Sequence, residues 1–255
     1  MTFLLKITLP PVLVAVISLV ARWWGPTIGG LLMGLPWMTG PVLVFLALDK
    51  GVPFAVEACT GIELGVICVA VFMLAYGAVS TVVRWPASVA AGAGAFGVSA
   101  LAMKDVALTL PEAAAVASAS LVFAYLVLPR PRTATVTAAL PWWDIPARML
   151  STVVLVAAIL VSADLLGPRL SGIVSTYPTM VTVISAFTHH QWGRDAVRRL
   201  LRGLALSLLV FVVFFLVVGT SMPAVGLVMS LVIAVALVLA IHAVLLVSMR
   251  RRLGT

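Results

Sequence analysis

Charged residues are scarce in this chain: Asp, Glu, Lys and Arg together make up 9% of its 255 residues. Soluble domains carry about a quarter charged residues, so this scarcity excludes an ordinary water-soluble fold. Hydrophobic residues fill 63% of the chain, and the mean hydropathy is +1.24. Apolar runs repeatedly reach the roughly 18–20 residues that cross a bilayer. The composition predicts an all-α, polytopic membrane protein that lies almost entirely within the lipid bilayer.

Cysteines and recognisable catalytic motifs are also scarce. The only cysteines, Cys59 and Cys68, lie nine residues apart in one apolar segment. Positions i and i+9 of a helix do not meet, which argues against a disulfide. The sequence has no nucleophile elbow, Walker loop, H-E-x-x-H motif or Rossmann fingerprint. The adjacent His189 and His190 do not make a metal site without further ligands. We therefore expect a protein that is not an enzyme and holds no cofactor or metal.

Acidic residues are outnumbered by basic ones, 8 against 16, and the formal net charge is +8. The basic residues lie singly or in short clusters at the ends of apolar segments, which indicates topology-setting charges and no nucleic-acid partner. With the N-terminus outside and nine crossings, twelve of the sixteen fall on the cytoplasmic side. This bias predicts an N-out, C-in orientation.

Interruptions by charge, Gly and Pro divide the chain into nine apolar segments. These are residues 4–22, 26–48, 54–79, 86–103, 111–129, 147–166, 168–190, 196–219 and 223–249. We expect a 4+1+4 organisation: a first membrane unit over residues 1–110, a connector over 111–146 and a second unit over 147–255. The charge distribution alone barely favours nine crossings over seven. If the second and seventh segments were re-entrant, the basic residues would divide eleven to five between the two sides of the membrane, which is almost the same bias. Whether segment 111–129 spans also stays open.

Two stretches of the chain, residues 25–51 and residues 167–193, align without gaps at a constant offset, which we call the repeat offset. Gly and Pro dominate the matches, and their spacing is harder to attribute to biased composition than that of Leu or Val. The identical pairs are Gly25/Gly167, Pro26/Pro168, Gly30/Gly172, Pro36/Pro178, Met38/Met180, Phe45/Phe187 and Gly51/Gly193. Five crossings separate the units, so the sequence predicts an inverted-topology repeat. An interfacial segment 111–129 would instead make the units parallel.

A proline sits at the middle of each aligned segment, Pro36 in the first and Pro178 in the second. Proline removes a backbone donor and stops or kinks the helix before it, which predicts broken second and seventh helices. Unpaired backbone groups at such a break are tolerated only where they face protein or water. The start of a half-helix suits an anionic or hydrogen-bond-accepting ligand. We expect a substrate site lined by Gly34, Pro36, Thr39, Ser175, Thr176, Pro178 and Thr179. The alternative is that the prolines merely kink packed helices.

Two of the ionisable residues within the apolar spans lie well away from the segment ends. Glu63 lies about nine residues into the third segment, near the middle of the bilayer, where an isolated charge is costly. His242 lies well inside the ninth segment, where it is either a proton partner or a neutral core residue. Both are candidates for coupling transport to protons.

The sequence Ser171 to Thr179, S-G-I-V-S-T-Y-P-T, resembles the A-G-L-I-x-x-F-P-T region of GlpM-type proteins, which are small bacterial inner-membrane proteins of about half this length. In the first unit G-G-L-L-M-G-L-P-W resembles it less closely, with Trp37 in place of Thr. Pro86 and Pro223 fit a later proline that starts the last helix of each unit. The resemblance implies a fused duplication of a half-size module in the bacterial cytoplasmic (inner) membrane, but supplies no activity or substrate.

The sequence therefore favours a transporter or permease for a small anionic or polar organic solute, with a site between two proline-broken helices. The alternative is a non-transporting scaffold or accessory subunit of an envelope-assembly system, whose breaks would be packed and dry. Formation of homo-oligomers stays open.

Overall fold

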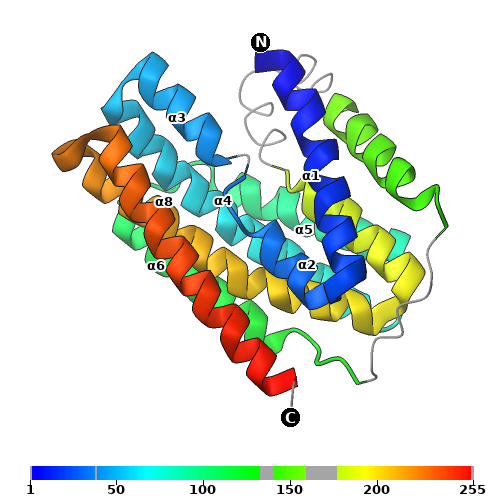
Figure 1. Ribbon diagram of the computed structural model, residues 1–255. Helices are drawn as coiled ribbons and strands as arrows, with labels where there is room; N and C mark the ends of the chain where they lie inside the picture. The colour runs from blue at the N-terminus through cyan, green and yellow to red at the C-terminus, as the bar shows by residue number, and fades with distance from the viewer. Residues whose placement is uncertain (1, 38, 133–140, 159–176, 254–255) are drawn as a thin grey trace.

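Figure 1 shows a computed structural model of the chain, in which the helices pack into one bundle. The structure describes residues 2–37, 39–132, 141–158 and 177–253, apart from the side chains of residues 2–7, 242 and 245–253. Within these ranges all regular secondary structure is helical, which confirms the all-α prediction for the described part of the chain.

The helices follow the predicted apolar segments closely. Up to residue 127 they are α1 (Thr2–Trp24), α2 (Pro26–Met33), α3 (Thr39–Lys50), α4 (Val52–Val79), α5 (Trp85–Met103) and α6 (Leu110–Val127). Farther along the chain residues 144–158 are helical, and α8 (Thr179–Leu253) follows. Helices α2, α4, α5 and α6 each have a proline in their first two positions. Proline suits that position because its fixed φ fits a helix and its missing N–H would be unpaired there.

Helix α8 consists of three parts, because Gly193 and Gly226 within it have non-helical backbone angles. Gly193 has φ of 81°, and its repeat equivalent Gly51 has φ of 88° at the junction of α3 and α4. Both angles lie where side chains with a Cβ are strained, so glycine is needed at both junctions. Gly226 corresponds at the repeat offset to Arg84, the residue before α5. The helix junctions of the two units therefore recur at the spacing of the repeat.

Among the residues that the structure describes, four helices are long and apolar enough to cross a membrane: α4, α5, α6 and the stretch Thr179–Ile241 of α8. They are compatible with the predicted membrane protein, while the count of nine crossings stays a prediction. The prediction that Pro223 starts the last helix is wrong. Pro223 lies within a helical part of α8, and the junction falls at Gly226, because its positive φ allows the sharp turn there.

The first unit packs against the second through small residues. Helix α2 lies against the middle part of α8, where a Cβ on Gly30 would collide with the backbone of Leu200 and one on Gly203 with the backbone of Thr27. Backbones approach this closely in membrane helices only where glycine or another small residue intervenes. This contact places the break after α2 directly beside α8.

Candidate functional site

The predicted break in the second apolar segment is present and lies between α2 and α3. Helix α2 ends at Met33 and α3 begins at Thr39. Continuing the helix would bring the ring of Pro36 against the carbonyl of Leu32, four residues earlier. The sequence therefore determines locally where α2 stops.

Two carbonyl groups in the last turn of α2 accept hydrogen bonds from side chains. The Ser207 hydroxyl of α8 donates to the Leu31 carbonyl. The Trp37 indole Nε1 donates to the Leu32 carbonyl at 3.0 Å, which also accepts from the Leu35 backbone N–H at 3.3 Å. An unpaired buried carbonyl costs about 1–3 kcal/mol, so the bond from Ser207 stabilises the broken conformation.

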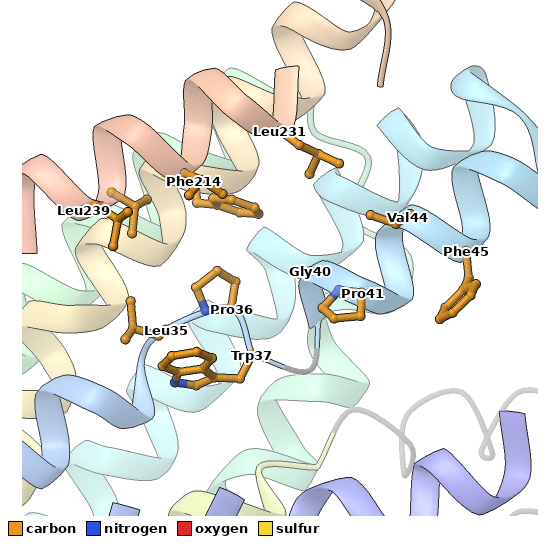
Figure 2. Close-up of a pocket in the computed structure, with 12 residues that line it drawn as sticks. Leu35, Pro36, Trp37, Gly40, Pro41, Val44, Phe45, Phe214, Leu231 and Leu239 are labelled. Atoms are coloured by element: carbon orange, nitrogen blue, oxygen red, sulfur yellow. The ribbon is translucent and has the colours of Figure 1, made fainter. Parts of the chain in front are cut away.

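A groove of about 540 Å³ lies beside the break (Figure 2). One wall comes from the break and α3, and the other from the middle and last parts of α8 (Figure 2). The first wall is made by Leu35, Pro36, Trp37, Gly40, Pro41, Val44 and Phe45. The second wall is made by Phe214, Leu231, Val235, Val238 and Leu239. These side chains are apolar except for the Trp37 N–H, which is already bonded, so the groove suits an apolar group.

Only part of the predicted substrate site lines this groove. Pro36 does, whereas Gly34 and Thr39 are not among the described lining residues. Gly34 is buried, and a Cβ there would collide with Ser207. Thr39 is half-buried at the start of α3. The first break thus carries an apolar groove where the sequence predicted a polar site.

The second break is predicted around Pro178, and the residues before Tyr177 that would form its first half lie outside the described part of the chain. At the described side of Pro178, aromatic rings pack closely. The Tyr177 ring packs edge to face against Phe96 of α5, with ring centroids 5.5 Å apart, and against Phe72 of α4 at 6.4 Å. The Thr182 hydroxyl lies 2.9 Å from the Tyr177 hydroxyl. Each aromatic pair contributes about 0.5–1.5 kcal/mol beyond its buried area. These contacts hold the start of α8 against α4 and α5.

The remaining predicted site residues of the second unit are placed as follows. Pro178 precedes α8 and its carbonyl accepts from Thr182, and Thr179 is the first residue of α8. Neither is among the described residues that line the groove beside Pro36. Ser175 and Thr176 lie outside the described residues. The structure therefore leaves untested the expectation of one pocket shared by the two breaks.

Glu63 is buried in the middle of α4. Its residue is 0% exposed, and neither carboxyl oxygen has a partner among the described residues. Cys59 lies one turn earlier on the same face, and a Cβ on Gly219 of α8 would meet both Cys59 and Leu110 of α6. Glu63 therefore lies on the face of α4 that carries Cys59, near α6 and α8. His242, the other predicted proton-coupling residue, lies in α8, but its side chain is outside the described part.

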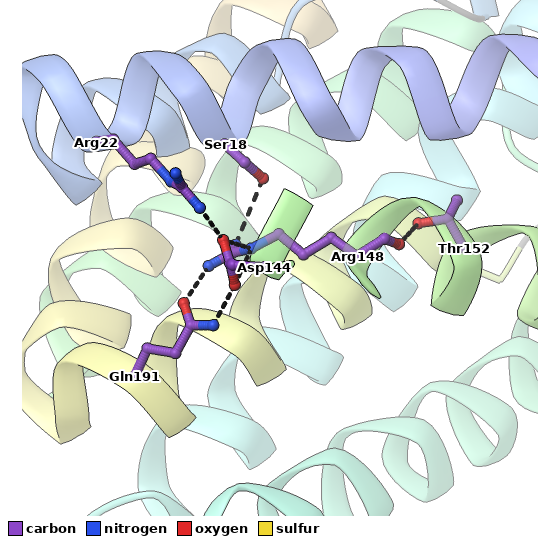
Figure 3. A network of polar contacts seen from close by, with 6 residues as sticks. All are labelled: Ser18, Arg22, Asp144, Arg148, Thr152 and Gln191. Carbon is purple, nitrogen blue, oxygen red and sulfur yellow. Dashed lines mark hydrogen bonds and ion pairs between the residues drawn. The ribbon is translucent and has the colours of Figure 1, made fainter. Parts of the chain in front are cut away.

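A charged network ties α1 of the first unit to the second unit (Figure 3). The Asp144 carboxylate accepts from Arg22 of α1 at 2.5 Å, from Arg148 at 3.0 Å and from the Gln191 amide of α8. Arg148 also donates to Gln191 at 2.7 Å and approaches Ser18 at 3.4 Å. Asp144 and Arg148 are almost fully buried. The network therefore links three helices: α1, the helix over residues 144–158, and α8.

Burial of Asp144 would by itself raise the pKa of its carboxyl group. The hydrogen bonds from Gln191 and Arg22 and the charge of Arg148 outweigh burial, so the pKa is lowered. The carboxylate thus stays ionised while the network is intact.

Sequence reasoning missed this network, because it treated Arg22 and Arg148 only as topology-setting charges. A signal was present: Asp144 is one of only eight acidic residues, and Arg148 follows it at the i+4 spacing of a helical ion pair. The other two partners, Arg22 and Gln191, are distant in the sequence, and no sequence pattern predicted that they would contact Asp144.

No group of three or more potential metal ligands occurs among the residues that the structure describes. Comparison with known protein families, curated proteins and solved structures gives no match. The similarity to GlpM-type proteins therefore stays a prediction from the short motif.

Proposed function

We propose that this protein is a membrane transporter for a small organic anion with an apolar body, and that protonation of Glu63 couples the transport to protons. The proposal includes an inverted-repeat architecture of nine crossings, N-out and C-in, in the bacterial inner membrane. The twelve-to-four distribution of basic residues and the recurrence of helix junctions at the repeat offset support that architecture.

The single observation that carries this proposal is the buried carboxyl group of Glu63, which has no hydrogen-bond partner in the part of the chain that the structure describes. Leaving a buried polar group without a partner costs about 1–3 kcal/mol. The equivalent residue of the second unit is the buried Ala205, so the fold can fill this position with a small apolar side chain. A carboxyl group retained at such a cost in a membrane helix is typical of a proton-binding site.

The groove beside Pro36 supports the apolar part of the proposed solute. Its walls combine the break with α8, so movement of either would reshape it. A small organic acid fits both features, because the groove takes its apolar body and a proton carried by the protein balances its charge.

The test uses purified protein in vesicles loaded with the pH-sensitive dye pyranine. A panel of small monocarboxylates with apolar side chains is added outside. We expect at least one of them to acidify the interior in wild type, and Glu63→Gln to abolish the signal. Glu57→Gln is the matched control, because Glu57 lies on the same helix but is exposed. Full, pH-independent uptake by Glu63→Gln contradicts the assignment of Glu63.

The alternative, a non-transporting scaffold, is favoured by one observation. The Leu31 and Leu32 carbonyl groups at the first break are hydrogen-bonded within the protein, and the groove has an apolar lining, as a packed and dry break requires. This alternative predicts that no solute in the panel produces a signal. It also predicts that a carbodiimide, which modifies protonated carboxyl groups within membranes, leaves Glu63 unlabelled.

A further inference from the structure

The residues that form the groove at the first break have equivalents at the second break. At the repeat offset, Leu35 corresponds to Tyr177, Phe214 to Phe72 and Val238 to Phe96. In the groove, Leu35 of the first unit lies with Phe214 and Val238 of the second.

Beside Pro178 the equivalent residues lie together with the units exchanged, and there they are in direct contact. There Tyr177 of the second unit packs against Phe72 and Phe96 of the first. Each break therefore docks on the third and fourth helices of the other unit. The two places differ in one respect: the first is an open groove, and rings fill the second.

We propose that the second break is a second solute site of the same kind, closed in this structure by Tyr177, and that the two sites open alternately. The inference rests on the proposed transport function and deepens it. In inverted repeats, exchanging the conformations of the two units produces the opposite-facing state. Applied to this chain, the exchange closes the groove between Leu35 and Val238 and separates Tyr177 from Phe96.

The chemistry of the second site differs from that of the groove. Its equivalents of Leu35 and Gly40 are Tyr177 and Thr182, which bring two hydroxyl groups within 2.9 Å of each other. When the rings separate, these hydroxyl groups become available to an oxygen acceptor, while Phe72 and Phe96 offer apolar surface. The second site therefore fits a carboxylate attached to an apolar body, and the first site fits the body alone.

The test is cross-linking with a short bis-maleimide in membranes, in a full-length chain with Cys59 and Cys68 replaced by alanine. One cysteine pair replaces Phe96 and Tyr177, and its repeat equivalent replaces Val238 and Leu35. Peptide mass spectrometry identifies the links, and size-exclusion chromatography confirms that each variant is folded. A pair replacing Tyr125 and Arg202, which contact each other between α6 and α8, is the control because neither break includes it.

We expect each pair to cross-link when present alone. In the four-cysteine chain, the cysteines at positions 96 and 177 are cross-linked first. We expect this link to slow the cross-linking of the cysteines at positions 35 and 238 at least about tenfold. The cross-linking rate of the control pair should stay unchanged. Equal rates in the linked and unlinked chains overturn the proposal. A pair at 35 and 238 that never links also overturns it, because the groove is then a fixed feature.

A second variant gives the two breaks the same side chains and adds no cysteine at the second break. Tyr177→Leu with Phe96→Val gives the second break the residues of the first. We expect faster linking of 35 with 238, because the closed second site has lost its ring contacts and its hydroxyl pair. An unchanged rate overturns the proposal. The vesicle assay with Glu63→Gln reports separately on the proposed function, so failure of alternation and failure of transport are distinguishable.

Discussion

Replacing Glu63 with methionine tests most directly the idea that this carboxyl group is kept for function at the expense of stability. Both of its oxygens are buried and unpartnered among the described residues. Methionine has a similar length, adapts its shape to apolar surroundings and carries no group that needs a hydrogen bond. Removing the unsatisfied group should therefore stabilise the fold by about 1–3 kcal/mol. For a chain of this size that corresponds to a rise in melting temperature of about 2–10 °C.

The chain contains its own reporters for this measurement. Cys59 and Cys68 are both buried, so a coumarin maleimide that fluoresces on reacting with thiols follows unfolding on heating. Because Cys59 lies one turn from Glu63, the measurement is repeated with Cys59 replaced by alanine. Glu57→Met is the control on the exposed face of the same helix, and it should change stability by less than about 0.5 kcal/mol.

Two results together support the reasoning: Glu63→Met melts at a higher temperature than wild type, and it loses the proton signal in vesicles. A fall in melting temperature refutes it, because a destabilised variant means that the carboxyl group has a partner that the variant leaves unpaired.

Three further predictions concern the contacts that hold the two units together. Asp144→Asn should destabilise the fold by about 3 kcal/mol, because it leaves two arginines without their carboxylate, as a chemical denaturation curve will show. The pKa of Asp144 is lowered in the folded state, so the carboxylate contributes stability above pH of about 4. This contribution should be lost as the pH falls through the folded-state pKa, and Asp144→Asn should lack this pH dependence. Gly203→Val should cost more than about 2 kcal/mol by pushing α8 from the backbone of Thr27, whereas Gly94→Ala, which meets nothing within 4 Å, should be nearly neutral in the same melt. Ser207→Ala should cost about 1 kcal/mol, because it leaves a carbonyl of α2 unpaired; an unchanged melting temperature means that water replaces the hydroxyl.

The sequence by itself predicted the features that depend on local backbone chemistry. Pro36 stops α2 through a clash that involves only its own neighbours, and the structure confirms the break there. Gly51 and Gly193 were paired by the repeat alignment, and both adopt the positive φ that glycine permits. Apolar length gave the positions of α1, α4, α5 and α6 to within a few residues. The misplaced start at Pro223 shows the limit of this reasoning, since a proline is tolerated within a helix when a glycine nearby takes the turn.

The tertiary structure decided which side chains meet. Whether the site at Pro36 is polar depended on what lies opposite the break, and α8 supplies Phe214 and Val238 from the second half of the chain. Arg22 was counted only among the topology-setting charges, and it pairs with Asp144 because the packing of α1 beside residues 144–158 brings them together. Contacts between residues this distant leave no pattern in a single sequence, since the energy that selects them comes from burial in the assembled bundle and not from neighbours along the chain.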